Sequence, residues 1–147
     1  MDKRIQEAIS LFEEVMIYGT ERVIRGVDDP IWKEFSPEQI QVLKLIDKEK
    51  EITSGRLAVL QGVHKSAISN RLKKLIEKEL VGIKSSGDKR EKIVVLTPQG
   101  REVVQKSDEV LHAYIGKLMA NQVDDDEIDQ FLATFRKLKE ILKMKGV

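Results

Sequence analysis

The sequence contains no cysteine and only two histidines. A chain without cysteine forms no disulfide, presents no thiolate nucleophile and holds no cysteine-ligated zinc. The histidines, His64 and His112, lie far apart in the chain, and neither has a second histidine at metal-ligand spacing. We therefore predict that the protein has no metal site and needs no cofactor.

Long apolar runs are also missing. No stretch approaches the roughly 18 apolar residues that a membrane span needs, and Glu13 and Glu14 interrupt the first apolar segment, unlike in a signal peptide. We predict a cytoplasmic protein that does not bind membranes. The sequence also has no glycine-rich phosphate loop, nucleophile elbow or ordered Ser/His/Asp set, so we predict no catalytic residues and no enzymatic activity.

Charge is abundant but unevenly distributed. The 147 residues are 41% hydrophobic and 35% charged, against about 25% charged residues in an average globular protein. The net charge is +1 for the whole chain, but +6 for residues 53–97 and −5 for the remainder. Such a basic middle is typical of a DNA-binding module on a scaffold that does not bind DNA, because Lys and Arg neutralise phosphates. The alternative is a solvated, charged face.

Helical periodicity dominates the first third of the chain. Apolar residues recur every three or four positions from Ile5 to Val23, which predicts a helix over about residues 2–25. Glycine, aspartates and Pro30 then predict a turn and a connector to about residue 35. Ser36, Pro37 and Gln39 form a capping-box pattern, and the helix they begin is expected to bury Ile40, Val42, Leu43 and Ile46.

The middle of the chain predicts two short helices and a hairpin. Thr53 can cap a helix that carries Leu57, Ala58 and Leu60 and ends at Gly62. A second helix begins near Lys65 and is expected to bury Ile68, Leu72, Leu75 and Ile76. The period then changes to two over residues 81–84 and 92–96, which predicts a β-hairpin with a basic tip.

Two longer helices complete the chain. Thr97 and Pro98 begin one over about residues 98–120, and Asp124 with Glu127 resembles a capping box for another that reaches about residue 145. The acidic run at residues 124–127 fits a helix start better than a cation site. The fold class is therefore mainly α with a small β-hairpin wing: a single chain, 1–147, whose winged helix-turn-helix spans 36–97 and whose dimerisation helices span 1–25 and 98–147.

The second short helix carries the candidate DNA-reading residues. A helix fills the major groove, so the side chains opposite its buried stripe read the bases. At about 100° per residue, Ser66, Ala67, Asn70, Lys73 and Lys74 face away from Ile68, and Ser69 lies beside them. We expect Asn70 to pair with adenine, and Lys65 and Arg71 to contact the DNA backbone. The alternative is an ordinary surface helix with a lysine-rich outer face.

The hairpin tip carries the second set of candidates, Asp88, Lys89 and Arg90. An arginine presented there can enter the minor groove, where negative potential concentrates. Asp88 can orient the Arg90 guanidinium through a bidentate pair. The alternative is a solvated turn without a ligand.

Together these residues resemble the MarR family of bacterial transcription regulators. The resemblance covers nearly the whole chain and rests on Leu57-Ala58, Gly62-Val63, Ser66, Ile68, Arg71-Leu72, Leu75, Leu80-Val81, Asp88-Lys89-Arg90 and Leu96-Thr97-Pro98-Gln99-Gly100. The chain departs from the family pattern at His64, where serine is common, and at Arg56, where an acidic residue is frequent.

The resemblance implies a sequence-specific DNA-binding regulator that acts as a homodimer on double-stranded, palindromic operator DNA and usually represses until a small-molecule effector binds. It also implies an effector pocket, for which Phe12, Met16, Tyr18 and Trp32 are candidates, with plain core packing as the alternative. The apolar surface of the terminal helices independently favours a dimer over a closed monomeric core. A second functional hypothesis is a winged-helix module whose basic face binds an acidic protein partner.

Overall fold

The computed structural model describes residues 1–85, 87 and 92–144. They form two compact units, residues 1–111 and 112–147. The N-terminal unit begins with α1 (Lys3–Gly26), which Asp2 caps by accepting a hydrogen bond from the Arg4 backbone N–H. No residue of α1 is buried. The predicted first helix is thus confirmed, but its apolar face is not buried within the single chain.

A short helix, α2 (Pro30–Glu34), replaces the predicted connector. The Asp29 carboxylate accepts a hydrogen bond from the Ile31 N–H at 3.0 Å, and Pro30 occupies the first helical position. The connector prediction was wrong because Asp-Pro can begin a helix as well as form a turn. This extra turn of helix buries Ile31 and places Phe35 in the core.

The three helices of the predicted winged helix-turn-helix follow in order: α3 (Pro37–Glu49), α4 (Ser54–Gln61) and α5 (Lys65–Glu77). Both bonds of the predicted capping box form between Ser36 and Gln39. Thr53 caps α4 by accepting from the Arg56 N–H, and Gly62 ends α4 in the left-handed region at φ 65°. The glycine is needed because a left-handed residue with a Cβ is strained.

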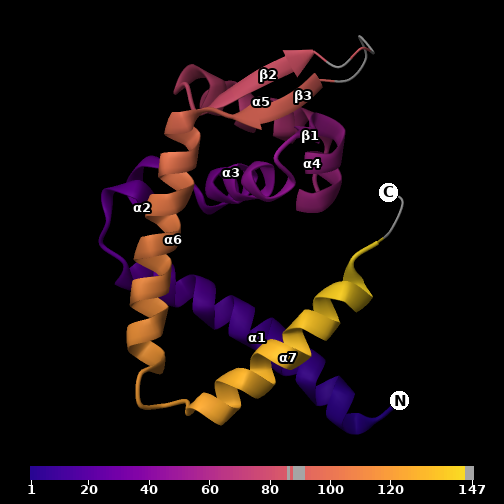
Figure 1. The fold of residues 1–147 in the computed structure, drawn as a ribbon, viewed down its shortest axis with the longest axis vertical. Coiled ribbons are helices and arrows are strands. Elements are labelled where there is room, and N and C mark those ends of the chain that lie inside the picture. The colour runs from indigo at the N-terminus through magenta and orange to yellow at the C-terminus, as the bar shows by residue number, and fades with distance from the viewer. Residues whose placement is uncertain (86, 88–91, 145–147) are drawn as a thin grey trace. The chain divides into compact units, whose positions relative to one another are not determined.

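The sheet has three antiparallel strands in the order β1-β3-β2 (Figure 1). The predicted hairpin is confirmed as β2 (Val81–Ser85) and β3 (Lys92–Leu96), with Val81 opposite Leu96. Strand β1 (Ile52–Thr53) was not predicted, and it pairs Ile52 with Val94. Two residues are too few to show a period, so β1 becomes evident only once β3 lies beside it.

One hydrophobic core joins these elements. It contains Ile31, Phe35, Ile40, Val42, Leu43, Ile46, Ile52, Leu57, Ala58, Ile68, Leu72, Leu75, Leu80, Val81, Val94, Leu96 and Val104. All four predicted core residues of α3 and three of the four in α5 are buried. Ile76 is the exception at 40% exposed, because it lies about 80° from Ile68 around the helix, at the edge of the buried stripe.

Helix α6 (Pro98–Met119) begins against the core and crosses the division between the two units. The Thr97 hydroxyl donates to the Glu79 carbonyl at 2.7 Å and accepts from the Gly100 N–H at 3.0 Å. Lys44 of α3 forms an ion pair with Asp108 of α6 at 2.9 Å. These contacts attach the first half of α6 to the winged-helix region.

The C-terminal unit contains the end of α6 and helix α7 (Asp125–Leu142). The capping box predicted for Asp124 and Glu127 is present, and no residue of α7 is buried. The Phe131 and Phe135 rings stack at 4.1 Å between centroids. None of the helices in the described part of the chain combines the length and apolar character of a membrane span.

Candidate nucleic-acid interface

The core holds α5 by one side and leaves its other side exposed. Ile68 and Leu75 are fully buried and Leu72 is 6% exposed. The turn that joins α4 to α5 is fixed by two backbone hydrogen bonds, from Gly62 N–H to the Val59 carbonyl and from Val63 N–H to the Ala58 carbonyl. A tight glycine turn between two packed helices is the arrangement of a helix-turn-helix, in which the second helix enters the major groove.

The outer face of α5 carries most of the predicted DNA-contacting residues. Exposed side chains there are Lys65, Ser66, Ser69, Asn70, Lys73 and Lys74. Ala67 and Arg71 are only partly exposed, at the edges of that face. The structure therefore brings the predicted helix residues together on one surface of hydroxyl, amide and ammonium groups. These groups match base edges and phosphates in their hydrogen-bonding chemistry.

The start of α5 differs from the other capped helices. His64 occupies the N-cap position with extended backbone, but its side chain makes no capping hydrogen bond. Ser36, Thr53 and Asp124 all cap their helices through a side-chain oxygen. The departure from serine noted in the sequence thus leaves the first turn of α5 without a side-chain acceptor. N–H groups at such a helix start can bond to a phosphate instead.

The described part of the wing consists of its two strands, β2 and β3. Lys84 and Lys92 are exposed on β2 and β3, and the Lys84 ammonium pairs with Glu51 before β1. The predicted tip residues Asp88, Lys89 and Arg90 lie outside the described residues.

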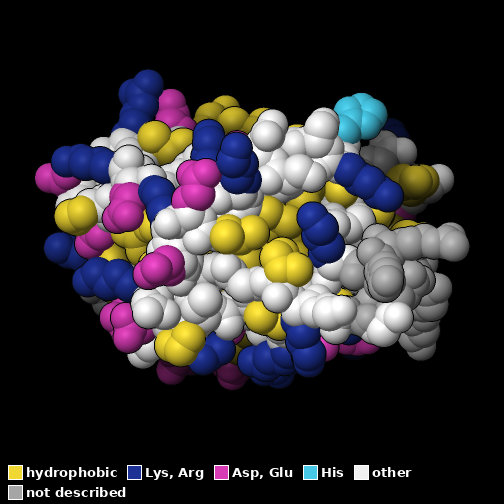
Figure 2. Space-filling model, turned by 90° about the horizontal axis from the view of Figure 1, so that it is seen from above, with side chains coloured by type: hydrophobic (Ala, Val, Ile, Leu, Met, Phe, Trp, Pro, Cys, Tyr) yellow, Lys and Arg dark blue, Asp and Glu magenta, His cyan; other side chains and the backbone are white. Residues whose placement is uncertain are grey.

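Figure 2 looks onto the end of the molecule that carries α5 and the hairpin. Lys and Arg side chains lie there among uncharged ones, while Asp and Glu side chains gather mainly on the left.

A hydrogen-bond network beside α5 was not predicted from the sequence. The Arg71 Nη1 group donates to Gln61 Oε1 at 2.6 Å, and Gln61 Nε2 donates to Gln41 Oε1 at 2.8 Å. Gln61 Nε2 also donates to the Glu38 backbone carbonyl at 3.1 Å. These residues are well separated in the sequence, so no local pattern signals the network.

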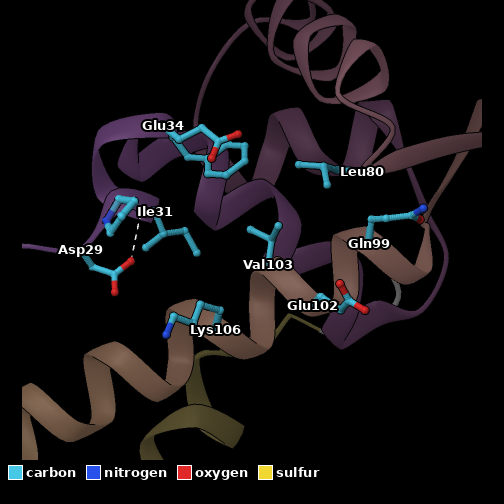
Figure 3. A pocket seen from close by; sticks show the side chains of 10 residues that line it. Asp29, Ile31, Glu34, Leu80, Gln99, Glu102, Val103 and Lys106 are labelled. Atoms are coloured by element: carbon cyan, nitrogen blue, oxygen red, sulfur yellow. Dashed lines mark hydrogen bonds between the residues drawn. The ribbon is translucent and has the colours of Figure 1, made fainter.

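A hollow of about 540 Å³ lies between α2 and the start of α6 (Figure 3). Ile31, Leu80 and Val103 project into it, and the charged side chains of Asp29, Glu34, Glu102 and Lys106 lie around them. Its lining is Asp29, Pro30, Ile31, Glu34, Phe35, Leu80, Gln99, Glu102, Val103 and Lys106.

None of the four candidate pocket residues from the sequence lines this hollow. Within the single chain, Phe12, Met16 and Tyr18 are exposed on α1 and take no part in its hydrophobic core. Trp32 does pack against the core, and its buried Nε1 has no hydrogen-bond partner within the described residues.

No group of three or more Asp, Glu or His side chains that could hold a metal ion occurs among residues 1–85, 87 and 92–144.

Comparison with known proteins identifies the family. A MarR family model matches residues 34–91, from the end of α2 into the wing. The HTH-type transcriptional regulator YdgG of Bacillus subtilis is 36% identical to the chain, over 99% of this chain and 95% of YdgG. The chain belongs to the MarR family. It is a DNA-binding transcription regulator, and the resemblance drawn from its sequence is confirmed.

Solved structures of MarR-family proteins share its fold. A mutant of MepR from a multidrug resistant S. aureus clinical isolate has a TM-score of 0.75 at 19% identity, covering 90% of this chain and 97% of MepR. A mutant of MarR from E. coli in complex with operator DNA has a TM-score of 0.66 at 21% identity, covering 95% of this chain and 96% of MarR. The predicted fold class, mainly α with a winged helix-turn-helix, is confirmed.

Proposed function

We propose that this MarR-family protein is a homodimeric, effector-responsive repressor in the cytoplasm. In this role two α5 helices bind successive major grooves of a palindromic operator. The observation that carries the proposal is the two-sided character of α5, with an apolar side fixed in the core and an exposed side of serine, asparagine and lysine. The complex of the E. coli MarR mutant with operator DNA supports it at the level of the shared fold.

Residue roles follow from the chemistry of this face. Asn70 pairs with adenine, since its amide donates and accepts in the same plane. Ser66 and Ser69 bond to bases or phosphates, while Lys65, Lys73 and Lys74 neutralise phosphates. Ala67 permits close approach to the bases. At the wing, Asp88 orients Arg90 into the minor groove, and Lys89 contacts the backbone.

The homodimer is supported by apolar surface on α1 and α7. Neither helix buries a residue. Large hydrophobic side chains that are at least 39% exposed include Ile5, Ile9, Leu11, Val15, Met16, Ile17, Ile24, Ile128, Phe131, Leu132, Ile141 and Leu142. Exposed apolar patches of this kind mark association surfaces, and identical copies most often associate about a twofold axis. Two recognition helices then meet half-sites about 34–36 Å apart.

The hollow between α2 and α6 is the candidate effector site. Its lining combines apolar side chains with the carboxylates of Asp29, Glu34 and Glu102 and the ammonium of Lys106. A ligand seated there touches both α6 and the Leu80 segment that follows α5, so it can alter how α5 is presented. A screen of small molecules for release of bound operator identifies the effector.

We assign the protein no enzymatic activity, in keeping with its regulator relatives.

Titration against DNA tests the proposal. Duplex from upstream of the protein's own gene is compared with random duplex over a series of salt concentrations. We expect tighter binding to the upstream duplex by a factor of at least about 10³, with affinity that falls steeply as salt rises. Equal affinity for both duplexes contradicts sequence-specific regulation. Failure to bind either duplex at low salt favours the alternative, a basic module that binds an acidic protein.

A further inference from the structure

Gln61 links three helices around the recognition helix. It is the last residue of α4 and is followed directly by the left-handed Gly62. Its side-chain carbonyl accepts from Arg71 of α5. Its amide N–H groups donate to the Gln41 side chain and the Glu38 carbonyl, both in α3. One side chain of α4 thus links α5 to α3.

The chemistry of the amide fixes the direction of this network. A glutamine side chain has one carbonyl acceptor and two N–H donors. Here both donors point to oxygen atoms of α3 and the carbonyl points to the Arg71 guanidinium. A reversed amide would place its N–H groups against a cation and its carbonyl against two acceptors. Only one orientation satisfies all three bonds, so the Gln61 carbonyl is held toward Arg71.

Arg71 is well placed to set the rotation of α5. It lies about 60° around the helix from Ile68, between the buried stripe and the exposed Asn70. It is partly buried and takes part in no ion pair among the described residues. Its bond to Gln61 is short, and hydrogen bonds from a charged donor are roughly twice as strong as neutral ones. The apolar stripe and this bond together hold α5 from two directions.

We propose that Arg71 is a positioning residue, which acts through Gln61 to set the rotation of α5 and so places Asn70 for base reading. This role differs from the backbone contact expected from the sequence, and it rests on the proposed function. A phosphate contact contributes equally to every DNA sequence and adds to the salt dependence of binding. A positioning residue contributes mainly to discrimination between sequences and leaves the salt dependence unchanged.

Four single variants and one double variant of the full-length protein separate the two roles, each titrated against upstream and random duplex over a salt series. Gln61→Leu breaks the network without changing charge, and Arg71→Lys keeps the charge but removes the planar guanidinium. Arg71→Gln removes the charge, and Lys73→Ala is the matched control for a phosphate contact. Thermal unfolding of each variant confirms that it is folded at the assay temperature.

We expect Gln61→Leu and Arg71→Lys each to reduce the ratio of specific to random affinity by about threefold to tenfold. The salt slope should not change in these two variants or in Arg71→Gln, whereas Lys73→Ala should lower it by about 0.9. The double variant Gln61→Leu/Arg71→Lys should lose little more than either single one, because both break the same bond.

Three results would overturn the positioning role. One is wild-type discrimination in Gln61→Leu, because a leucine offers the Arg71 guanidinium no acceptor. Another is a salt slope lowered by about 0.9 in Arg71→Gln, and the third is additive losses in the double variant. Each of these leaves the proposed function intact. If the wild-type protein binds neither duplex, the proposed function fails and this inference fails with it.

Discussion

At the residue scale, the junction between the winged helix and α6 depends on Gly100. A Cβ at this position would lie 2.2 Å from the Leu80 carbonyl oxygen and 3.1 Å from Leu96 Cδ2. Both neighbours belong to the sheet side of the core, so neither moves freely. We expect Gly100→Ala to lower the free energy of unfolding by about 1–3 kcal/mol, as overpacked sites do, measured by chemical denaturation.

Gly116 provides the matched control on the same helix, since nothing lies within 4 Å of a Cβ built there. Gly116→Ala should raise the free energy of unfolding by about 0.4–1 kcal/mol, because alanine reduces the entropy of the unfolded chain. Equal effects at the two positions would show that the contact with Leu80 does not limit the residue at position 100.

Glu79 is a second site where the backbone favours glycine. It has φ 62° at the end of α5, a left-handed conformation that costs a residue with a Cβ roughly 1–2 kcal/mol. Its carbonyl accepts from the Thr97 hydroxyl, a bond that any residue can keep. We expect Glu79→Gly to raise the free energy of unfolding by about 1 kcal/mol. Glu79→Ala keeps a Cβ and should gain nothing, so a gain in both variants would assign the effect to the lost carboxylate.

Residue-scale prediction from sequence succeeds where the physics is local. The capping boxes at Ser36 and Asp124 join residues three positions apart, and both form as the pattern predicts. The bond between Arg71 and Gln61 spans a helix-helix turn and depends on how α4 and α5 pack. No spacing rule encodes that geometry, so only the folded structure shows it.

At the element scale, the DNA contacts that we propose for α5 are of two kinds. Asn70 and Lys73 lie on the same exposed face, but an amide reads base edges whereas an ammonium neutralises phosphate. We expect Asn70→Ala to weaken binding to the operator by about 1–3 kcal/mol with little effect on random duplex. Lys73→Ala should weaken both by similar amounts. Equal losses on both duplexes for Asn70→Ala would show that Asn70 does not read a base.

The elements that the sequence predicts poorly are the shortest ones. Long amphipathic helices such as α1 and α6 repeat their pattern many times, and their bounds match the prediction closely. Helix α2 has five residues and β1 has two. Neither is long enough to show a period, and β1 is defined by its pairing with β3. Such elements depend on tertiary contacts more than on local preference.

At the scale of the whole molecule, the proposed homodimer would connect the apolar faces of the terminal helices to DNA binding. The periodicity of α1 predicts a buried stripe, yet Ile9 is 51% exposed and no residue of the helix is buried. An exposed stripe of this kind is what the proposed homodimer requires, because a second copy would cover it. Binding to a palindrome by two linked recognition helices is far tighter than binding by one, because the second contact is effectively intramolecular.

Ile9→Gln tests this link. A twofold interface contains each substituted side chain twice, and burial of an isoleucine contributes about 1.5–3 kcal/mol. The dimer dissociation constant should therefore rise by roughly two to four orders of magnitude, as measured by sedimentation equilibrium. Operator affinity should then depend on protein concentration, while thermal unfolding of the winged-helix region changes little.

Glu14→Gln introduces the same residue at an exposed position about 140° around α1 from Ile9, and it should leave both association and operator binding at wild-type values. If Ile9→Gln dissociates the dimer but operator affinity is unaffected at low protein concentration, a single recognition helix is sufficient for binding. The palindromic mode would then be wrong, although sequence-specific recognition by α5 would stand. If both variants stay dimeric, the α1 face is not the association surface, and the exposed side of α7 becomes the next one to test.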